Sequence, residues 1–235
     1  AASPPSFVSP SMVGFLADKG GLHTMEDFSA CEADWVQPIS TTYNDHRIWQ
    51  IPPNGQGMVA LLMLNILEGF ENEGLEPTSA MRLHREIEAA RFGYAARDAY
   101  LGQETSQPLE WLISKDYAAE CRAQIDDFKA AEPLPRIDPG VAHKDTVYLT
   151  VVDKDRNAVS LINSIYFPFG SAQVCPKTGV VFQNRGASFN LTPGHANCLE
   201  GGKRPMHTII PGMITNKAGR VSHAYGVMGG QYQPF

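Results

Sequence analysis

The chain has 235 residues, of which 43% are hydrophobic and 19% charged, and this composition is typical of a folded protein with a substantial core. Its net charge of −6 and its scattered basic residues argue against nucleic-acid binding, which needs a basic face. The longest apolar run, near residues 58–67, is too short to cross a bilayer. We therefore expect a soluble protein whose partner is a small-molecule amide or peptide, with no nucleic-acid or membrane partner.

The first half of the chain is predicted to be mainly helical. Residues 1–20, rich in Ser, Pro and Gly, predict an irregular arm, and Thr24 with Asp27 three residues later predicts the capped start of a short helix. One strand and then three helices are expected over residues 43–51, 54–70, 78–100 and 108–125. Thr78 is the expected N-cap of the second of these helices. Three prolines predict an exposed connector over residues 132–140, where a processing site would be accessible.

The second half is predicted to be rich in strands. Residues 146–152 and 158–165 flank a polar turn and predict a hairpin. Further strands are expected over residues 179–182, 209–215 and 222–227. Helices followed by strands predict an α+β fold with a mostly antiparallel sheet.

The strongest candidate for chemistry is Thr146, which follows Asp145 at the end of the Pro-rich connector. Cleavage before Thr146 would leave its hydroxyl as a nucleophile beside a free α-amino group, and that amine is a ready general base with a reference pKa of about 7.7–8.0. The hairpin should bring Ser164 close enough to bond the Thr146 hydroxyl or amine. The simpler interpretation is a β-branched residue that begins a strand.

Two other segments carry candidate site residues. Gly229 and Gly230 form either a tight turn or a pair of backbone N–H groups that stabilise an oxyanion. His207 and Thr208, beside the basic pair Lys203-Arg204, lie in a solvated loop or hold a substrate carboxylate or carbonyl. The seven histidines and four separated cysteines form no metal pattern, so we expect neither metal nor organic cofactor.

Taken together, these segments resemble the γ-glutamyltranspeptidase family of N-terminal-nucleophile hydrolases. The residues that carry the resemblance are Thr146–Asp153, Phe169-Gly170, the Gly179 strand, Lys203–Pro205, Gly229-Gly230 and, upstream, Pro52–Gly57 with its apolar helix. The resemblance implies a four-layer αββα sandwich, apparently incomplete at both ends. Residues 1–145 would be the C-terminal part of the large-subunit region and 146–235 the N-terminal part of the small-subunit region, forming one structural domain after self-cleavage at Asp145–Thr146.

The resemblance also implies a mechanism. Thr146 would form an acyl-enzyme with an amide such as a γ-glutamyl compound, glutathione included, while Ser164 contacts the nucleophile and Gly229 and Gly230 form the oxyanion hole. Water or an amine would then resolve the acyl-enzyme. The large and small subunits of one precursor would stay together as partners. The sequence does not determine the cellular compartment. A cytoplasmic location is slightly favoured, and a periplasmic or secreted location would require a signal peptide upstream of Ala1.

Departures from the family pattern concern the substrate. The transpeptidases carry Asn where this chain has Tyr166, an acidic residue where it has Ser188, and a Ser-Ser pair where it has His207 and Thr208. In that family these positions hold the α-amino and α-carboxylate groups of the γ-glutamyl substrate, so the resemblance implies that all four residues bind substrate. These versions are similar to an acylase-like or oxamate-amidohydrolase-like branch, in which Arg185 would bind a carboxylate through its planar guanidinium. The alternatives are therefore an acylase or amidohydrolase acting on a small acidic amide such as oxamate, and a non-catalytic binding relative.

Overall fold

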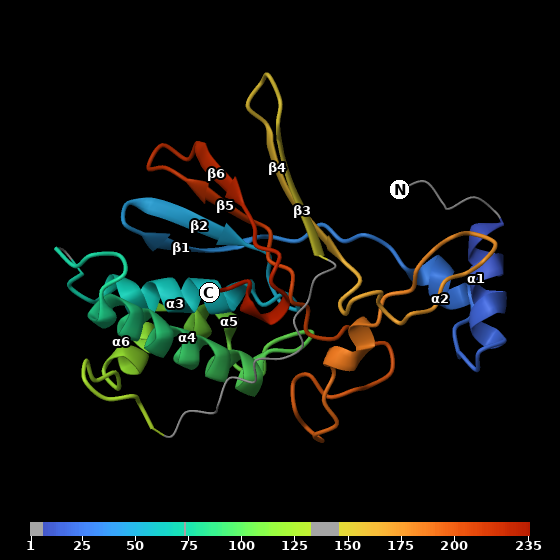
Figure 1. The fold of residues 1–235 in the computed structure, drawn as a ribbon, viewed down its shortest axis with the longest axis horizontal. Coiled ribbons are helices and arrows are strands. Elements are labelled where there is room, and N and C mark those ends of the chain that lie inside the picture. The colour runs from blue at the N-terminus through green and yellow to red at the C-terminus, as the bar shows by residue number, and fades with distance from the viewer. Residues whose placement is uncertain (1–6, 73, 133–145) are drawn as a thin grey trace.

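The computed structural model describes residues 7–72, 74–132 and 146–235 (Figure 1). A helical layer packs against an antiparallel sheet whose strand order is β1-β2-β5-β6. The helices of this layer are α3 (Gly57–Glu68), α4 (Ala80–Tyr100), α5 (Leu109–Leu112) and α6 (Lys115–Arg122). The strands are β1 (Ile39–Tyr43), β2 (His46–Gln50), β5 (Gly212–Thr215) and β6 (Val221–Tyr225). Because β2 pairs with β5, segments from the two halves of the chain form one sheet.

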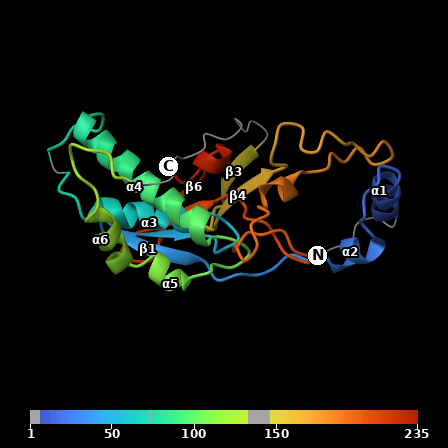
Figure 2. The same ribbon diagram turned by 90° about the horizontal axis from the view of Figure 1, so that it is seen from below.

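The core lies around α3, between the sheet and the other helices. Seen from the helical side, α4 crosses over α3 (Figure 2). Met58, Leu61, Leu62 and Ile66 of α3 are completely buried. An almost uninterrupted apolar sequence is expected for a helix that is covered on all sides. Gly93 of α4 allows the close approach, because a Cβ there would lie 2.9 Å from Met63 and 3.1 Å from Val59.

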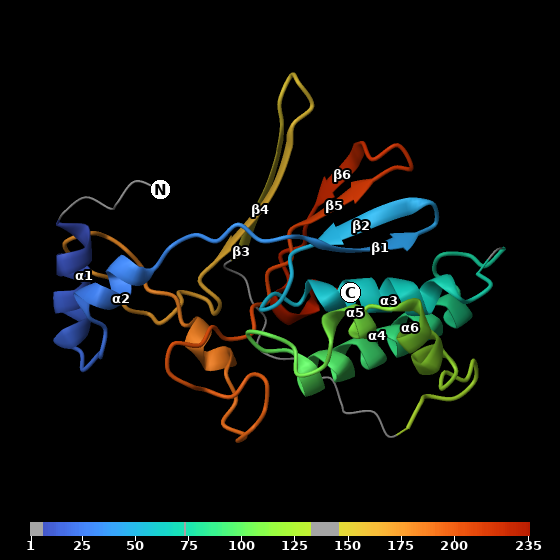
Figure 3. The ribbon, with the colours of Figure 1, turned by 180° about the vertical axis from the view of Figure 1, so that it is seen from behind.

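A separate two-stranded hairpin, β3 (Thr146–Val152) and β4 (Ala158–Ser164), projects away from the helices (Figures 1 and 3). Its register pairs Thr146 with Ser164 and continues to Val152 and Ala158. Ser160 Oγ donates to the backbone oxygen of Tyr225 at 3.0 Å and so joins the hairpin to the end of β6. One face of the hairpin is apolar and 42–59% exposed; it comprises Val147, Leu149, Val151, Val159 and Leu161.

The predicted irregular arm was wrong. Residues Val8–Ala17 form helix α1, and α2 (Met25–Ala30) follows it at the end of the molecule away from α3–α6 (Figure 3). Pro10 is compatible with α1 because it lies in the first turn, where an N–H has no intrahelical partner. The helix packs on the loop after β4, with the rings of Phe15 and Phe182 stacked at 6.0 Å. The capped start of α2 was confirmed, because Thr24 and Asp27 form a reciprocal capping box.

Several boundaries differ from the sequence predictions for local reasons. The predicted strand over 43–51 is interrupted at Asn44 and Asp45, whose φ values of 44° and 65° form a hairpin turn between β1 and β2. The N-cap of α4 is Ser79 rather than Thr78. The helix expected over 108–125 is divided, because Ser114 accepts a hydrogen bond from the Tyr117 amide and caps a new helix, α6.

Two predicted strands are also shorter or missing. The strand expected over 209–215 begins only at Gly212, directly after Pro211, which has no N–H for the ladder. Residues 179–182 contribute a single bridge, Val174 to Val181. The predicted connector over 132–140, apart from its first residue, lies outside the described residues, and so does Asp145. Within the described ranges, no helix is long and apolar enough to span a membrane.

Candidate active site

Thr146 begins β3 beside Ser164, the last residue of β4. Its side chain is buried, with the residue 6% exposed, and its Oγ1 donates to Ser164 Oγ at 3.1 Å. Ser164 Oγ also accepts from the Tyr166 amide at 3.1 Å and from Arg185 Nη2 at 3.5 Å. The expected contact between Thr146 and Ser164 is therefore present. The two donors at 3.1 Å, the Thr146 hydroxyl and the Tyr166 amide, match the two lone pairs of the serine oxygen, and the Arg185 contact at 3.5 Å is the weakest of the three.

Arg185 is a buried cation next to this pair. It lies in a short 3₁₀ turn, η1 (Arg185–Ser188), and is only 5% exposed. Its guanidinium carbon lies 4.1 Å from the centre of the Tyr166 ring, and its Nη1 donates to Thr208 Oγ1 at 2.8 Å. Among the described residues, no carboxylate forms an ion pair with Arg185. Burial lowers its pKa from 12.5 to about 10, so the side chain remains charged at neutral pH.

His207 and Thr208 lie on a segment fixed by the loop that precedes α3. The His207 amide donates to the Asn54 oxygen at 2.8 Å, and the Gln56 amide donates to the His207 oxygen at 3.0 Å. Burial, with a smaller contribution from Arg185, lowers the pKa of His207 to about 4. His207 Nδ1 accepts from the Ile209 amide at 3.3 Å. The imidazole is therefore neutral at pH 7 with its proton on Nε2, so its free ring atom is a donor group and neither nitrogen is left to act as a base.

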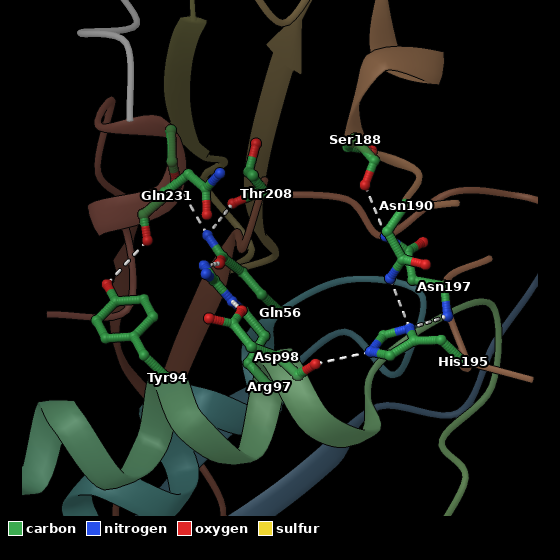
Figure 4. Close-up of polar contacts among 11 residues, drawn as sticks. Gln56, Tyr94, Arg97, Asp98, Ser188, Asn190, His195, Asn197, Thr208 and Gln231 are labelled. Carbon is green, nitrogen blue, oxygen red and sulfur yellow. Dashed lines mark hydrogen bonds and ion pairs between the residues drawn. The ribbon is translucent and has the colours of Figure 1, made fainter. Parts of the chain in front are cut away.

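Ser188 lies in the same region but its hydroxyl is directed at the backbone. Ser188 Oγ is 2.9 Å from the Arg185 oxygen and 2.8 Å from the Met206 oxygen, both of which are acceptors. The following loop is fixed by Asn197, which donates to the Ser188 oxygen at 2.6 Å, and by His195, which donates to the Asp98 oxygen at 2.8 Å (Figure 4). Ser188 thus supplies no charge to the site and joins η1 to the His207 segment.

Gly229 and Gly230 follow β6 after a short extended segment, and Gly230 begins a second 3₁₀ turn, η2 (Gly230–Tyr232). Gly230 has a φ of +52°, a conformation that favours glycine. Among the hydrogen bonds between described residues, neither glycine donates its backbone N–H. The Gly230 oxygen accepts from Gln56 Nε2 at 3.0 Å. Within the described part of the chain, neither N–H is thus committed to a hydrogen bond.

A continuous set of contacts joins these residues. It runs from Thr146 through Ser164, Arg185 and Thr208 to Gln56, whose Nε2 contacts both the Thr208 oxygen at 2.8 Å and the Gly230 oxygen. The sequence analysis missed Gln56 and its partner Arg97, which donates to Gln56 Oε1 at 3.1 Å. The sequence did place Gln56 in the Pro52–Gly57 segment, which is part of the family resemblance. However, a glutamine between two glycines at the start of a helix does not reveal which distant residues its side chain will contact.

Fold and site together define an α+β protein in which a strand-initial threonine, a serine and a buried arginine meet beside a glycine pair. Residues 7–235 match the family model described as "Gamma-glutamyltranspeptidase", and the chain belongs to that family.

Relatives of the chain carry several names within this family. It is 39% identical over 226 residues to the "Glutathione hydrolase-like YwrD proenzyme" of Bacillus subtilis, covering 95% of this chain and 42% of that protein. It is 36% identical over 213 residues to the "Oxamate amidohydrolase proenzyme" of Klebsiella pneumoniae, covering 90% of this chain and 39% of that protein. The structure of a cephalosporin acylase from Bacillus halodurans superimposes with a TM-score of 0.84 at 38% identity, covering 97% of this chain and 41% of the acylase.

The chain therefore spans about two-fifths of the length of the relatives that it matches. These relatives support the acylase-like branch of the family inferred from the sequence.

Proposed function

We propose that the protein containing this chain is a self-processing threonine hydrolase that cleaves an amide through an acyl-enzyme on Thr146. The observation that carries the proposal is the buried Thr146 hydroxyl, 3.1 Å from Ser164 Oγ, beside a buried guanidinium. Three relatives are named as proenzymes, which supports processing. In this proposal residues 1–145 and 146–235 belong to the large- and small-subunit regions of one precursor, and the subunits remain associated.

Processing would proceed by an N-to-O acyl shift. Thr146 Oγ attacks the carbonyl carbon of Asp145, the C–N bond breaks, and the hydroxyl proton passes to the departing nitrogen. The shift leaves the new α-amine on Thr146, and water then hydrolyses the ester to the Asp145 carboxylate and the Thr146 hydroxyl. That amine would be the general base in catalysis, because its ordinary pKa leaves a useful fraction of it unprotonated near neutral pH.

Catalysis would repeat the same chemistry on an external amide. Thr146 Oγ attacks the amide carbonyl, its proton moves to the α-amine, and the tetrahedral intermediate places negative charge on the carbonyl oxygen. The unengaged N–H groups of Gly229 and Gly230 would bind that oxygen. The amine leaves with the proton from the α-ammonium group, and water or a second amine attacks the acyl ester and frees Thr146.

The substrate is proposed to carry a carboxylate on its acyl group. Arg185 is charged, buried and without an acidic partner among the described residues, so a carboxylate ligand would satisfy it in a bidentate manner. A γ-glutamyl substrate also needs a partner for its α-ammonium group, and Ser188 directs its hydroxyl at backbone oxygens instead. Tyr166, His207 and Thr208 would complete the pocket around Arg185. A small acidic amide is therefore favoured, with transfer of γ-glutamyl groups as the second candidate.

The four-layer αββα sandwich stays a proposal for the whole protein. The described residues supply one helical layer, one four-stranded sheet and one hairpin. The apolar face of the hairpin is about half exposed, which supports a further layer packed against it.

Intact-mass analysis of the purified full-length protein tests the proposal. We expect two fragments divided at Asp145–Thr146, an uncut Thr146→Ala variant, and normal cleavage in Thr150→Ala, a matched change at an exposed position of the same strand. Cleaved protein should hydrolyse glutaryl-p-nitroanilide faster than γ-glutamyl-p-nitroanilide. A parent that stays intact and inactive would support the non-catalytic binding relative, and a preference for the γ-glutamyl probe would support the second candidate.

A further inference from the structure

Gln56 is a buried amide whose side-chain hydrogen bonds join three parts of the chain. It is completely buried at the start of α3. Its Nε2 donates to the Thr208 oxygen at 2.8 Å and to the Gly230 oxygen at 3.0 Å, while its Oε1 accepts from Arg97 Nη1 at 3.1 Å (Figure 4). One nitrogen therefore holds both the segment that contacts Arg185 and the glycine turn.

Arg97 determines which way this amide faces. Arginine has only donors, and a backbone carbonyl has only an acceptor. The Gln56 oxygen must therefore face Arg97, and the NH₂ group must face the two carbonyls. Arg97 is itself 7% exposed and is fixed by Asp98 Oδ1, 2.7 Å from its Nε, and by the Tyr94 ring, 4.8 Å from its guanidinium carbon.

The turn is held at a second point from the same helix. Tyr94 Oη donates to the Gln231 oxygen at 2.8 Å, one residue beyond the glycine pair (Figure 4). Helix α4 thus contacts η2 directly through Tyr94 and indirectly through Arg97 and Gln56. Glycine has more backbone freedom than any other residue, whereas an oxyanion hole needs its N–H groups fixed before the reaction begins. A glycine pair in this role therefore needs contacts that hold its backbone in place.

We propose that Gln56, oriented by Arg97, is a positioning residue that fixes the Gly229–Gly230 backbone relative to the Thr208 segment. This inference rests on the proposed function, because it requires that these N–H groups receive the oxyanion. Gln56 does not contact the reacting atoms. Its contribution is to the barrier of acylation. Ground-state binding of the substrate would be provided by the Arg185 pocket, whose His207–Thr208 segment is also held by backbone hydrogen bonds to Asn54 and Gln56 and by the bond from Arg185 to Thr208, none of which needs the Gln56 side chain.

The test is Gln56→Glu in the processed full-length protein, with glutaryl-p-nitroanilide as the probe. The substitution keeps shape and the acceptor for Arg97 but replaces the NH₂ donors by a carboxylate oxygen facing two carbonyls. We expect kcat to fall about 100-fold with KM within about threefold, since small misplacements of catalytic groups cost that much. Protonation would return one donor, so the ratio of variant to parent kcat should rise as the pH is lowered.

The matched control is Gln50→Glu, a change at another buried glutamine, 2% exposed, whose Nε2 donates to Tyr225 Oη at 3.0 Å. It should lower stability without changing the ratio of kcat to KM by more than about threefold.

If Gln56→Glu does not fold, variants of Arg97 provide a second test. Arg97→Met removes the donor that orients Gln56, whereas Arg97→Lys restores a cationic donor, so kcat should be lower in the Met variant than in the Lys variant.

The outcomes separate this inference from the proposed function. A parent that hydrolyses the probe, with Gln56→Glu equal to it in kcat at every pH, would overturn the positioning role alone. Equal kcat in Arg97→Met and Arg97→Lys would do the same. A parent that neither cleaves itself nor hydrolyses the probe would overturn the proposed function, and the positioning role with it. A large, pH-dependent kcat loss at constant KM supports the inference.

Discussion

Replacing Arg185 by Met should stabilise the substrate-free protein while removing its response to a dicarboxylate. The Arg185 side chain is 5% exposed and has no carboxylate partner among the described residues. The free-energy cost of removing its charge from water is therefore only partly offset by its contacts with neutral groups. Met has a similar length and no charge. A residue retained for ligand binding is expected to cost stability when the ligand is absent.

The magnitude follows from the pKa. A pKa lowered from 12.5 to about 10 corresponds to about 3 kcal/mol against the charged form in the folded protein. This cost is fully present at neutral pH and fades as the pH rises from about 10 toward the pKa of the unfolded chain. The variant loses the hydrogen bond to Thr208, the longer one to Ser164 and the contact with Tyr166, together about 1–2 kcal/mol. The net gain of about 1–2 kcal/mol should raise the Tm by roughly 2–8 °C.

Thermal unfolding at pH 7, with and without glutarate, measures both effects. Glutarate at about 100 times its Kd should stabilise the parent by about 2.7 kcal/mol and leave Arg185→Met unchanged. Arg85→Met is the control, since Arg85 forms a two-point ion pair with Asp127 at 2.8 and 2.7 Å and its loss should lower the Tm. A Tm for Arg185→Met several degrees below that of the parent, or equal glutarate stabilisation of both, would refute the reasoning.

Three further changes test other parts of the structure. His207 has its folded pKa lowered to about 4, so the parent should lose about 2–3 kcal/mol as the pH falls from 6.5 to 4, and His207→Gln should flatten that loss in urea titrations. His195→Ala removes the donor to the Asp98 oxygen and the Nδ1 acceptor of the Asn197 amide, and limited proteolysis should cut the 190–204 loop faster than in the parent. Leu62→Ala, at a completely buried position of α3, should cost about 2–5 kcal/mol in urea unfolding, whereas Leu22→Ala, at a position 92% exposed, should change the stability little.

The features predicted well from the sequence depend on neighbours along the chain. The capping box of Thr24 and Asp27, the apolar helix α3 and the register that pairs Thr146 with Ser164 all follow from local spacing. A hairpin with a short turn has few alternative registers, so the contact between the threonine and the serine was accessible without any knowledge of the rest of the fold.

The features that were missed depend on tertiary contacts. Helix α1 has a weak local signal, and its packing on the loop after β4 includes the stacking of Phe15 and Phe182. The hydrogen bond from the Ser188 hydroxyl to the Met206 oxygen was missed for the same reason, because the two residues are 18 positions apart in the chain. Propensity and spacing do not contain this information, because each contact joins segments whose proximity is decided by the packing of other elements.

Buried polar side chains indicate where this chain departs from a purely structural core. Five of these side chains are each at most 7% exposed: Thr146, Arg185, Thr208, Gln56 and Arg97. Consecutive contacts join them, with Ser164 as the link between Thr146 and Arg185. Apolar residues at these positions would avoid the desolvation cost of two cations, so folding alone does not explain the cluster. The neutral partners that surround Arg185 satisfy its hydrogen bonds but leave its charge unbalanced. In the proposed function, a substrate carboxylate at Arg185 would balance this charge.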